Sequence, residues 1–424
     1  PESAAPANEN VTPVAQVADL TGDGFDDIIL HNFFNAASLG NQHFVLKNLG
    51  DGTFEDISST TGLFDVRAQV FAYGDLDNDG DQDVVVATPY EEDGAHHRVF
   101  LNSGDATFVE VAQPGIPTTT PCCLTAGVVL ADFNGDAKLD AFLVNGYSSD
   151  AVRDQLLFGN GDGTFTDAGG NLAGNSPKPS NGATTCDWDD DGDLDIFVAT
   201  YGVSFQNGHN VLWRNDGAGQ FTNVADEVGF AALATGNYYM ASTGNGLDAQ
   251  PSGTAVGSNA FGIVCQDVNN DGWLDLYVGA ISHPDADFER KWSDPTVLLI
   301  NEGPATGFHL TNEFLARKLQ FNEGDLDVSA ADFDNDGRLD LAVQRDRKYE
   351  SRYPAGAPEL HGWFGLMHQL PDGTFENAGF SSGVNDLEGE AQLAKGAGQH
   401  AWADIDHDGD VDLLIGLSFY SGLP

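Results

Sequence analysis

Positive charge is scarce in this 424-residue chain, which has 17 Lys and Arg against 66 Asp and Glu and a formal net charge of -49. Binding to nucleic acid or to an anionic membrane surface needs clustered cations, so neither is expected as a partner. No run of about 18 apolar residues occurs, and the sequence therefore predicts no membrane span. Methionine is also rare, with 2 residues, which together with the high Asp content is typical of a secreted or salt-adapted surface.

The remaining composition favours a folded chain rich in turns. Hydrophobic residues make up 41% and aromatic residues 10%, which is enough for a core and excludes global disorder. Glycine is unusually frequent, at 51 residues, and predicts many turns between short strands. Residues 1–13 contain the stretch PESAAPANE, and we expect a flexible N-terminal segment left after processing, followed by one domain over residues 14–424.

One acidic motif, D-x-[DNT]-x-D-[GA]-x-x-D, occurs seven times, between 55 and 80 residues apart. We number the motifs loops 1 to 7 and their residues positions 1 to 9. The loops begin at Asp19, Asp75, Asp132, Asp187, Asp267, Asp332 and Asp404. Internal repetition at such a period is the mark of a fold built from similar units.

The spacing of the motif predicts calcium loops. Ca²⁺ takes about six to eight oxygen ligands, and side chains at positions 1, 3 and 5 of a tight turn converge on one point. Glycine at position 6 permits the turn, while the carbonyl of position 7 and the carboxylate of position 9 complete the shell. The predicted ligands are Asp19, Thr21, Asp23, Phe25 and Asp27 in loop 1; Asp75, Asp77, Asp79, Asp81 and Asp83 in loop 2; Asp132, Asn134, Asp136, Lys138 and Asp140 in loop 3; Asp187, Asp189, Asp191, Asp193 and Asp195 in loop 4; Asp267, Asn269, Asp271, Trp273 and Asp275 in loop 5; Asp332, Asp334, Asp336, Arg338 and Asp340 in loop 6; and Asp404, Asp406, Asp408, Asp410 and Asp412 in loop 7.

An EF-hand opens in the same way but needs a bidentate Glu at position 12 and flanking helices. Position 12 is apolar in all seven loops: Leu30, Val86, Leu143, Val198, Val278, Val343 and Ile415. Runs such as DVVVATP and DIFVATY follow the loops and favour strands. The loops are therefore predicted to join β-strands.

The seven loops differ in donor quality. Loops 2, 4, 6 and 7 have four carboxylates each, whereas loop 1 has Thr21 and loops 3 and 5 have Asn134 and Asn269. Loop 3 also has Ala137 at position 6, so we expect it to bind most weakly. Without metal the carboxylates of a loop repel one another, and calcium is expected to contribute directly to folding.

A second pattern follows most loops, as in FVLKNLGDGTFEDIS (44–58) and VLWRNDGAGQFTNVA (211–225), and it predicts strand, glycine-rich turn and strand. One repeat thus supplies four antiparallel strands, A to D, with the calcium loop between A and B. Four-stranded units at this period are blades of a β-propeller, and seven units predict an all-β, seven-bladed propeller.

These motifs resemble the FG-GAP/VCBS repeats of calcium-binding propellers, the type found in the heads of integrin α-subunits. The resemblance covers about residues 14–418 and implies a propeller stabilised by up to seven Ca²⁺ ions. Proteins of this kind include adhesins, lectins and carbohydrate-active enzymes, so the resemblance does not select an activity.

The seventh repeat is incomplete in this chain. It has strand A (398–403) and strand B (411–418), but no sequence for strands C and D follows. An open sheet edge promotes aggregation, so we expect a downstream segment, a retained fragment or a partner to complete this blade.

The face opposite the calcium loops is the predicted ligand site, since it receives the long and dissimilar B–C and D–A loops. We expect a glycan or protein ligand there, bound by Arg290, Trp292, Arg352 and Trp363. The alternative is an extracellular enzyme. A lyase acting on uronate polysaccharides could use His283, Arg345, Arg347, Tyr349 and His361 as carboxylate-neutralising, basic and acidic groups.

The four cysteines are Cys122, Cys123, Cys186 and Cys265. An even count favours disulfides and, with the acidic composition, a secreted, extracellular, periplasmic or cell-surface protein. Whether Cys186 and Cys265 meet depends on strand orientation. His96, His97, Cys122 and Cys123 could instead form a soft-metal site, which would make the protein a copper or zinc metalloenzyme.

Overall fold

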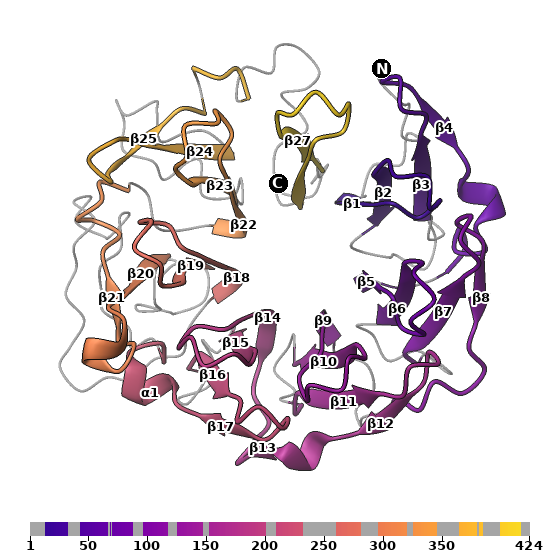
Figure 1. The fold of residues 1–424 in the computed structure, drawn as a ribbon, viewed down its shortest axis with the longest axis horizontal. Coiled ribbons are helices and arrows are strands. Elements are labelled where there is room, and N and C mark those ends of the chain that lie inside the picture. Colours follow the sequence, from indigo (N-terminus) through magenta and orange to yellow (C-terminus); the bar gives the residue numbers. More distant parts are fainter. Residues whose placement is uncertain are drawn as a thin grey trace, which may run out of the picture.

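The sheets of the protein are arranged in a ring, as the computed structural model shows (Figure 1). The described residues are 13–32, 43–66, 68, 70–87, 96–117, 125–146, 152–200, 209–231, 260–280, 296–319, 325–345, 364–379, 381–384 and 399–416. All structural statements below concern these residues. Their secondary structure is almost entirely β, which confirms the predicted all-β propeller arrangement.

The first three blades are four-stranded antiparallel sheets in simple sequence order. Blade 1 consists of β1 (Pro13–Ala18), β2 (Asp27–Asn32), β3 (His43–Asn48) and β4 (Phe54–Asp56). Blade 2 consists of β5 (Val70–Gly74), β6 (Asp83–Ala87), β7 (Arg98–Asn102) and β8 (Phe108–Glu110). Blade 3 consists of β9 (Thr125–Ala131), β10 (Asp140–Asn145), β11 (Gln155–Gly159) and β12 (Phe165–Asp167).

Blades 4 to 6 repeat this plan. Blade 4 consists of β14 (Ser180–Cys186), β15 (Asp195–Thr200), β16 (Val211–Arg214) and β17 (Phe221–Asn223), and β13 (Leu172–Ala173) adds a parallel edge strand to it. Blade 5 consists of β18 (Ala260–Gln266), β19 (Asp275–Ala280), β20 (Val297–Asn301) and β21 (Leu310–Asn312). Blade 6 consists of β22 (Asp325–Ala331), β23 (Asp340–Arg345), β24 (Phe364–Gln369) and β25 (Phe375–Asn377).

The second strand of blades 2 to 6 is buried along its whole length. Its sequence is a continuous apolar run rather than an alternating one, because both of its faces pack within the protein. The clusters of apolar side chains join neighbouring blades: Ile29 and Val45 of blade 1, for example, share a cluster with Phe71 and Phe100 of blade 2. The core is therefore a series of interfaces between blades, and loops 2 to 6 are each followed by a fully buried strand.

The last sheet has only two described strands, β26 (His400–Ala403) and β27 (Asp412–Ile415). It lies between blade 6 and blade 1 (Figure 1). The side-chain amide of Asn48 donates to the carbonyl of Ile405 at 2.8 Å, and the amide of Gln344 donates to the carbonyl of Gly416 at 3.0 Å. Six complete blades and one two-stranded unit thus form the ring, and we refer to this unit as the half-blade.

Two neighbouring inner strands are joined covalently. Cys186 at the end of β14 and Cys265 in β18 form a disulfide, with their Cα atoms 6.5 Å apart. The sequence left this pairing open, and the structure assigns it. Cys122 and Cys123 lie outside the described residues.

Helical structure is minor. In the ranges given above it comprises α1 (Ala225–Val228) and three short 3-10 helices, Ser58–Thr60, Gly169–Asn171 and Pro304–Thr306. In the described part of the chain, no helix has the length and apolar character needed to cross a membrane.

Candidate metal centres

All seven acidic loops share one hydrogen-bonded frame. In loop 2 the backbone amides of Asp79 and Gly80 donate to the two carboxylate oxygens of Asp75, at 3.1 and 3.2 Å. The amide of Asp81 donates to Asp79 Oδ1 at 3.1 Å. The equivalent three bonds recur in the other six loops. The side chain at position 1 is therefore held in place by the turn that it begins.

Two residues of each loop have a left-handed backbone. Position 6 has a positive φ throughout, as the predicted glycine requires, and Ala137 of loop 3 adopts φ 63° without being glycine. Position 4 is also left-handed in every loop, which the sequence analysis missed. Its residues all tolerate this conformation or are known to favour it, and they are Gly22, Asn78, Gly135, Asp190, Asn270, Asn335 and His407.

The carboxylate at position 9 connects the loop to its own blade. In loop 2, Asp83 is fully buried and accepts the backbone amide of Leu76 at 2.8 Å. Its other oxygen accepts the amide of Asn102, at the end of strand β7, also at 2.8 Å. Position 9 of loops 1, 3, 5 and 6 accepts the same pair of donors. The residue is thus a structural cross-link as well as a candidate ligand.

The buried position-9 carboxylates of loops 1 to 6 have a raised pKa. Burial, the largest cause, and neighbouring loop carboxylates raise the pKa of Asp83 and Asp140 to about 6. The same causes raise the pKa of Asp275 to about 7 and that of Asp195 to about 8. A cation among these oxygens would remove most of this cost, because opposite charge favours the ionised form.

Loop oxygens converge closely enough to hold one ion. Carboxylate oxygens from positions 1, 3 and 9 lie within 4.8 Å of one another in loops 2, 6 and 7, and those from positions 1, 3 and 5 do so in loop 4. Carboxylate and hydroxyl oxygens on a tight turn are the donors that a hard divalent cation such as Ca²⁺ prefers.

Orphaned oxygens provide an independent test of fit. Thr21 Oγ1, Asp77 Oδ1 and Asp189 Oδ1 are buried and have no hydrogen-bond partner, and all three occupy position 3. In loop 4, Asp193 Oδ1 and Asp195 Oδ2 are in the same state. Buried polar atoms normally have partners, since leaving one without a partner costs about 1–3 kcal/mol. The donor atoms of loops 1, 2 and 4 therefore fit a metal ion. The buried oxygens without partners that indicate this could not be seen in the sequence.

Protein cations lie beside three of the loops. Lys47 pairs with Asp23 at 2.8 Å, Lys138 lies 3.7 Å from Asp136, and Arg338 forms an ion pair with Asp336. These carboxylates all occupy position 5. The pairs neutralise part of the loop charge in loops 1, 3 and 6. Among the loops with four carboxylates, loops 2, 4 and 7 have no such Lys or Arg pair within the described residues.

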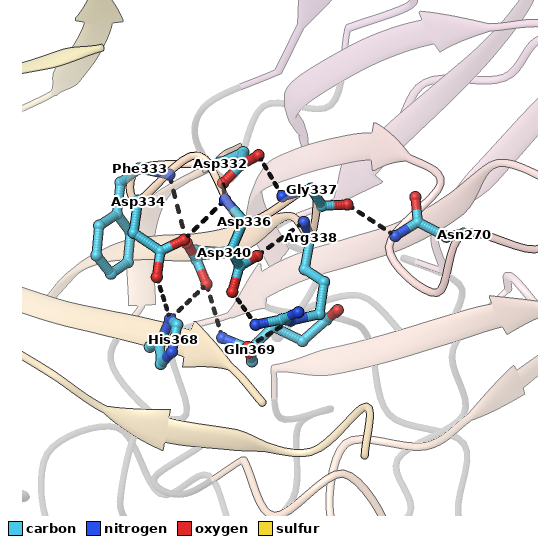
Figure 2. Close-up of polar contacts among 10 residues, drawn as sticks. All are labelled: Asn270, Asp332, Phe333, Asp334, Asp336, Gly337, Arg338, Asp340, His368 and Gln369. Carbon is cyan, nitrogen blue, oxygen red and sulfur yellow. Dashed lines mark hydrogen bonds and ion pairs between the residues drawn. The ribbon is translucent and has the colours of Figure 1, made fainter. Parts of the chain in front are cut away.

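Figure 2 shows the polar contacts of loop 6, including the ion pair of Arg338 with Asp336. The ring of His368 approaches Asp334 at 3.6 Å and Asp340 at 3.2 Å, from strand β24 of the same blade. Asn270, in loop 5, donates to the carbonyl of Gly337 at 3.1 Å and so connects adjacent loops. Asn335 of loop 6 likewise donates to Asp410 Oδ1 of loop 7 at 2.6 Å, so loops 5, 6 and 7 contact one another in sequence.

The opposite face is described only in part. Of the candidate lyase residues, His283, Arg347, Tyr349 and His361 lie outside the described residues, as do the ligand-binding candidates Arg290, Trp292, Arg352 and Trp363. Arg345 is described and is 1% exposed. Its Nε donates to Asp325 Oδ1 at 3.0 Å, and Thr296 Oγ1 donates to Asp325 Oδ2 at 2.6 Å. Arg345 thus takes part in a buried ion pair within the fold.

The soft-metal candidates are also only partly described. His97 is buried and shares a 3.2 Å hydrogen bond with Thr125 Oγ1, and burial, followed by the nearby His96, lowers its pKa to about 4. Within the described ranges, neither His96 nor His97 belongs to a group of three His, Cys, Asp or Glu ligand atoms close enough for one ion. Cys122 and Cys123 lie outside those ranges.

A second histidine pair occurs on the same side of the ring. His31 and His43 stack with ring centroids 5.9 Å apart, and His43 Nε2 lies 2.7 Å from Tyr73 Oη. Burial, with the charge of His31 as a smaller cause, holds the pKa of His43 well below its usual value. Both rings pack against Phe71 of blade 2, so the pair lies in the interface between blades 1 and 2.

Comparison with known proteins identifies the class of repeat. The FG-GAP-like repeat model matches residues 19–86, 75–143 and 132–198, and each match runs from one acidic loop to the strand after the next. The chain thus contains FG-GAP-like repeats in a propeller arrangement.

Curated relatives are similar over part of the chain. Cartilage acidic protein 1 of Xenopus tropicalis is 28% identical over 204 residues, which is 46% of this chain and 30% of that protein. Cartilage acidic protein 1 of Mus musculus is 28% identical over 206 residues, with the same coverage. The similarity therefore spans less than a third of the length of these relatives.

Solved structures with a similar chain path are distant in sequence. An Agrocybe aegerita lectin described as recognising non-reducing terminal N-acetylglucosamine gives a TM-score of 0.48 at 17% identity, covering 86% of this chain and 79% of the lectin. The V. cholerae biofilm matrix protein Bap1 gives a TM-score of 0.41 at 12% identity, covering 95% and 84%. A Bacillus licheniformis rhamnogalacturonan lyase gives 0.39 at 12%, covering 96% and 73%. Similarity at this level does not identify a ligand or an activity.

Proposed function

We propose that this protein is a secreted, calcium-stabilised propeller with up to seven Ca²⁺ sites, one in each acidic loop. The observation that carries the proposal is the set of buried, unpartnered oxygens at position 3 of loops 1, 2 and 4. The shared frame around position 1 supports extending the assignment to all seven loops. Each ion would be held by positions 1, 3, 5 and 9 together with the carbonyl of position 7.

The role proposed for calcium is structural. It would neutralise carboxylates that the fold brings together and would connect the loop to the two strands that it joins. The residues on this face need only hold the ion, because their hydrogen bonds already fix the turn. The chemical work of the protein is therefore assigned to the other face.

Ligand recognition is proposed for the face that carries the B–C and D–A connections, with a glycan or a protein as the ligand. The disulfide Cys186–Cys265 agrees with an oxidising compartment, and the similarity to proteins named for cartilage agrees with an extracellular one. Binding is favoured over lyase chemistry because Arg345, the one described candidate of the lyase set, is buried in its ion pair with Asp325.

The test is a binding screen on the calcium-loaded chain with a panel of neutral and uronate-bearing glycans and extracellular matrix proteins. We expect saturable binding that Arg352→Ala and Trp363→Ala weaken, with calcium content unchanged. If a uronate polysaccharide yields unsaturated products, the function is that of a lyase rather than of a binding protein. About one equivalent of copper or zinc in protein purified without a metal-affinity tag would favour the metalloenzyme instead. No binding to any member of a broad panel would count against recognition by this face.

A further inference from the structure

Complete blades are connected to the preceding blade by one recurring side chain. The residue at the end of strand C, or directly after it, donates a hydrogen bond from its side-chain amide to the preceding blade. The acceptor is the backbone carbonyl of position 2 in the acidic loop of that preceding blade. Asn102 donates to Leu20 at 2.9 Å, and Asn215 donates to Phe133 at 2.9 Å. The same bond occurs in blades 1, 5 and 6, from Asn48 to Ile405, from Asn301 to Trp188 and from Gln369 to Val268. We call this side chain the latch.

Blade 3 has no latch side chain but makes an equivalent hydrogen bond to the preceding blade through its backbone. Gly159 stands there, because a Cβ atom would collide with the carbonyl of Leu139. Its backbone amide still donates to Asp140 Oδ1 at 2.8 Å, as the latch amides do to position 9 of their own loops. Gly163 of the following turn then donates to the carbonyl of Leu76 at 3.3 Å. Every complete blade thus satisfies the position-2 carbonyl of the blade before it.

An aromatic side chain covers the same spot. Five of the six complete blades have Phe six residues after the latch, where strand D begins: Phe54, Phe108, Phe165, Phe221 and Phe375. Phe221 packs edge-on against Phe133, with centroids 5.9 Å apart, and in blade 5 Phe308 packs in the same way against Trp188 at 5.6 Å. The position-2 side chains of loops 1 to 5 are buried as a result.

Among the described residues, the half-blade has the receiving groups but not the groups that fill them in complete blades. Position 9 is buried in loops 1 to 6, but its equivalent in loop 7, Asp412, is exposed. Asp412 Oδ2 accepts the amide of Ile405 at 3.1 Å, whereas no described residue donates to its Oδ1, which elsewhere receives the latch amide. Phe333, at position 2 of loop 6, is only half-buried, and no described residue donates to its carbonyl.

The half-blade is nevertheless firmly attached. His400 lies between Asp327 and Ser329 of β22, since its backbone amide donates to Asp327 at 2.8 Å and its Nε2 lies 2.5 Å from Ser329 Oγ. Trp402 Nε1 also donates to Ser329 Oγ, at 2.8 Å. These bonds attach β26 to β22, and no described strand pairs with the other edge of β27.

We propose that the outer edge of β27 binds a β-hairpin of this chain's own C–D type, supplied by polypeptide other than the described residues. The hairpin has a Val or Leu and a large apolar residue, then any residue, then Asn or Gln as the latch. A glycine-containing turn follows, with Phe six residues after the latch. The occupant is thus defined by sequence, and an arbitrary apolar strand does not meet the definition.

The register of docking follows from the other blades. The residue two before the latch pairs with position 10, as Phe100 does with Val84 and Trp213 does with Ile196. In the half-blade it pairs with Leu413, which is half-buried, as is Ile415. The latch amide then donates to Asp412 Oδ1 and its side chain to the carbonyl of Phe333, while the hairpin Phe covers the ring of Phe333.

The test appends residues 98–110 of this chain, RVFLNSGDATFVE, to its own C-terminus through a flexible linker. Fusion raises the local concentration of the hairpin to the order of millimolar, so weak intrinsic pairing is not an obstacle. Controls are the same fusion with Asn102→Ala in the appended copy, the fusion with a scrambled hairpin, and the unmodified chain. The readout is hydrogen exchange of the β27 amides, Leu413 to Ile415, with the oligomeric state measured in parallel.

We expect the appended hairpin to slow exchange of these amides at least tenfold, and Asn102→Ala in the appended copy to remove most of that protection. The scrambled hairpin should give none, and all four proteins should remain monomeric. Equal exchange in all of them would overturn the proposal, as would equal protection by the scrambled hairpin. Strong protection in the unmodified chain together with dimers would identify a second copy of the chain as the occupant instead. None of these outcomes depends on calcium stoichiometry or on the ligand of the other face.

Discussion

At the scale of single residues, the oxygen atoms at position 3 of the loops are the main indication of a metal site. Asp77 and Asp189 each have one buried carboxylate oxygen without a hydrogen-bond partner, and the hydroxyl oxygen of Thr21 is in the same state. Neutral and charged side chains share the position only in the ability to offer an oxygen. This common property fits a metal ligand better than it fits any hydrogen-bond role.

Removing the carboxylate of Asp77 should separate metal binding from folding. Asp77→Ala is expected to lower calcium content by one equivalent and to reduce the calcium-induced gain in stability by about 2.7 kcal/mol, if free calcium is 100 times the dissociation constant. In chelator the variant should be at least as stable as the parent, because burial and nearby carboxylates raise the pKa of Asp77 and make its charge unfavourable. Unfolding by urea with and without calcium measures both effects.

The matched control is Asp51→Ala, on an exposed turn of the same face, where Asp51 accepts the backbone amide and the hydroxyl of Thr53. Its calcium-induced gain should equal that of the parent. Equal losses in both variants would show that the loss reflects surface charge rather than a bound ion.

Ala137 explains why loop 3 was ranked weakest. Its left-handed backbone costs a non-glycine residue about 1–2 kcal/mol. Ala137→Gly is therefore expected to stabilise the calcium-bound chain by about 1 kcal/mol. This gain is the sum of two changes: a higher free energy of unfolding of the metal-free chain and a higher calcium affinity of loop 3. Calcium titration and chemical unfolding of the variant check this, and Ala106→Gly provides a control at another left-handed residue outside the loops. A loss of stability in Ala137→Gly would contradict the explanation.

Arg345 is expected to matter for folding whatever the protein binds. Arg345→Ala leaves Asp325 charged, buried and without its ion-pair partner, which should destabilise the protein by about 3–5 kcal/mol. Arg98→Ala, which breaks the more exposed pair with Glu110, should cost at most about 1 kcal/mol. A native-like unfolding midpoint for Arg345→Ala would show that the ion pair is dispensable and would reopen a direct role in ligand chemistry.

At the scale of elements, much of the fold could be predicted from the sequence. The apolar runs after each loop predicted strands, and the structure confirms strand B in all six complete blades. Counting strands also predicted that the last repeat has only strands A and B in this chain; β26 and β27 are the two strands described there, and the absence of the outer strands stays a prediction. Local pattern sufficed because each blade is a meander of neighbouring segments.

Contacts between blades were harder to predict, because they depend on twist and on spacing across the ring. The latch asparagines were visible in KNLG, LNSG, RNDG and INEG, yet their target is a carbonyl 82 residues away in two of the described bonds. Cys186 and Cys265 stand at different offsets from their loops, so register alone did not pair them. A bulge in β18 between Ala260 and Ile263 shows that the inner strands do not follow one uniform register.

The disulfide between β14 and β18 should stabilise the interface of blades 4 and 5. It closes a loop of 79 residues, for which the chain-entropy model gives about 4 kcal/mol. Replacing both Cys186 and Cys265 by Ala should therefore lower the free energy of unfolding by several kcal/mol, as measured by urea unfolding. Reductant should destabilise the parent and leave the double variant unchanged. If reductant acts equally on both proteins, the bond does not carry this stability.

For the molecule as a whole, repulsion between negative charges is the main electrostatic term that opposes folding. A net charge of -49 concentrated partly on one acidic face opposes the compact state. Seven divalent ions would bring the net charge to about -35, and they would act where the carboxylates are closest. Folding and calcium binding should therefore be strongly linked across the ring.

The most direct test of this account is the calcium content of the intact chain. The protein would be purified without chelators or a metal-affinity tag, dialysed against low free calcium and analysed for metals by elemental analysis. The account predicts close to seven equivalents of calcium per chain, with loop 3 the first to be lost as free calcium is lowered. A chain that binds no calcium while remaining folded would contradict it.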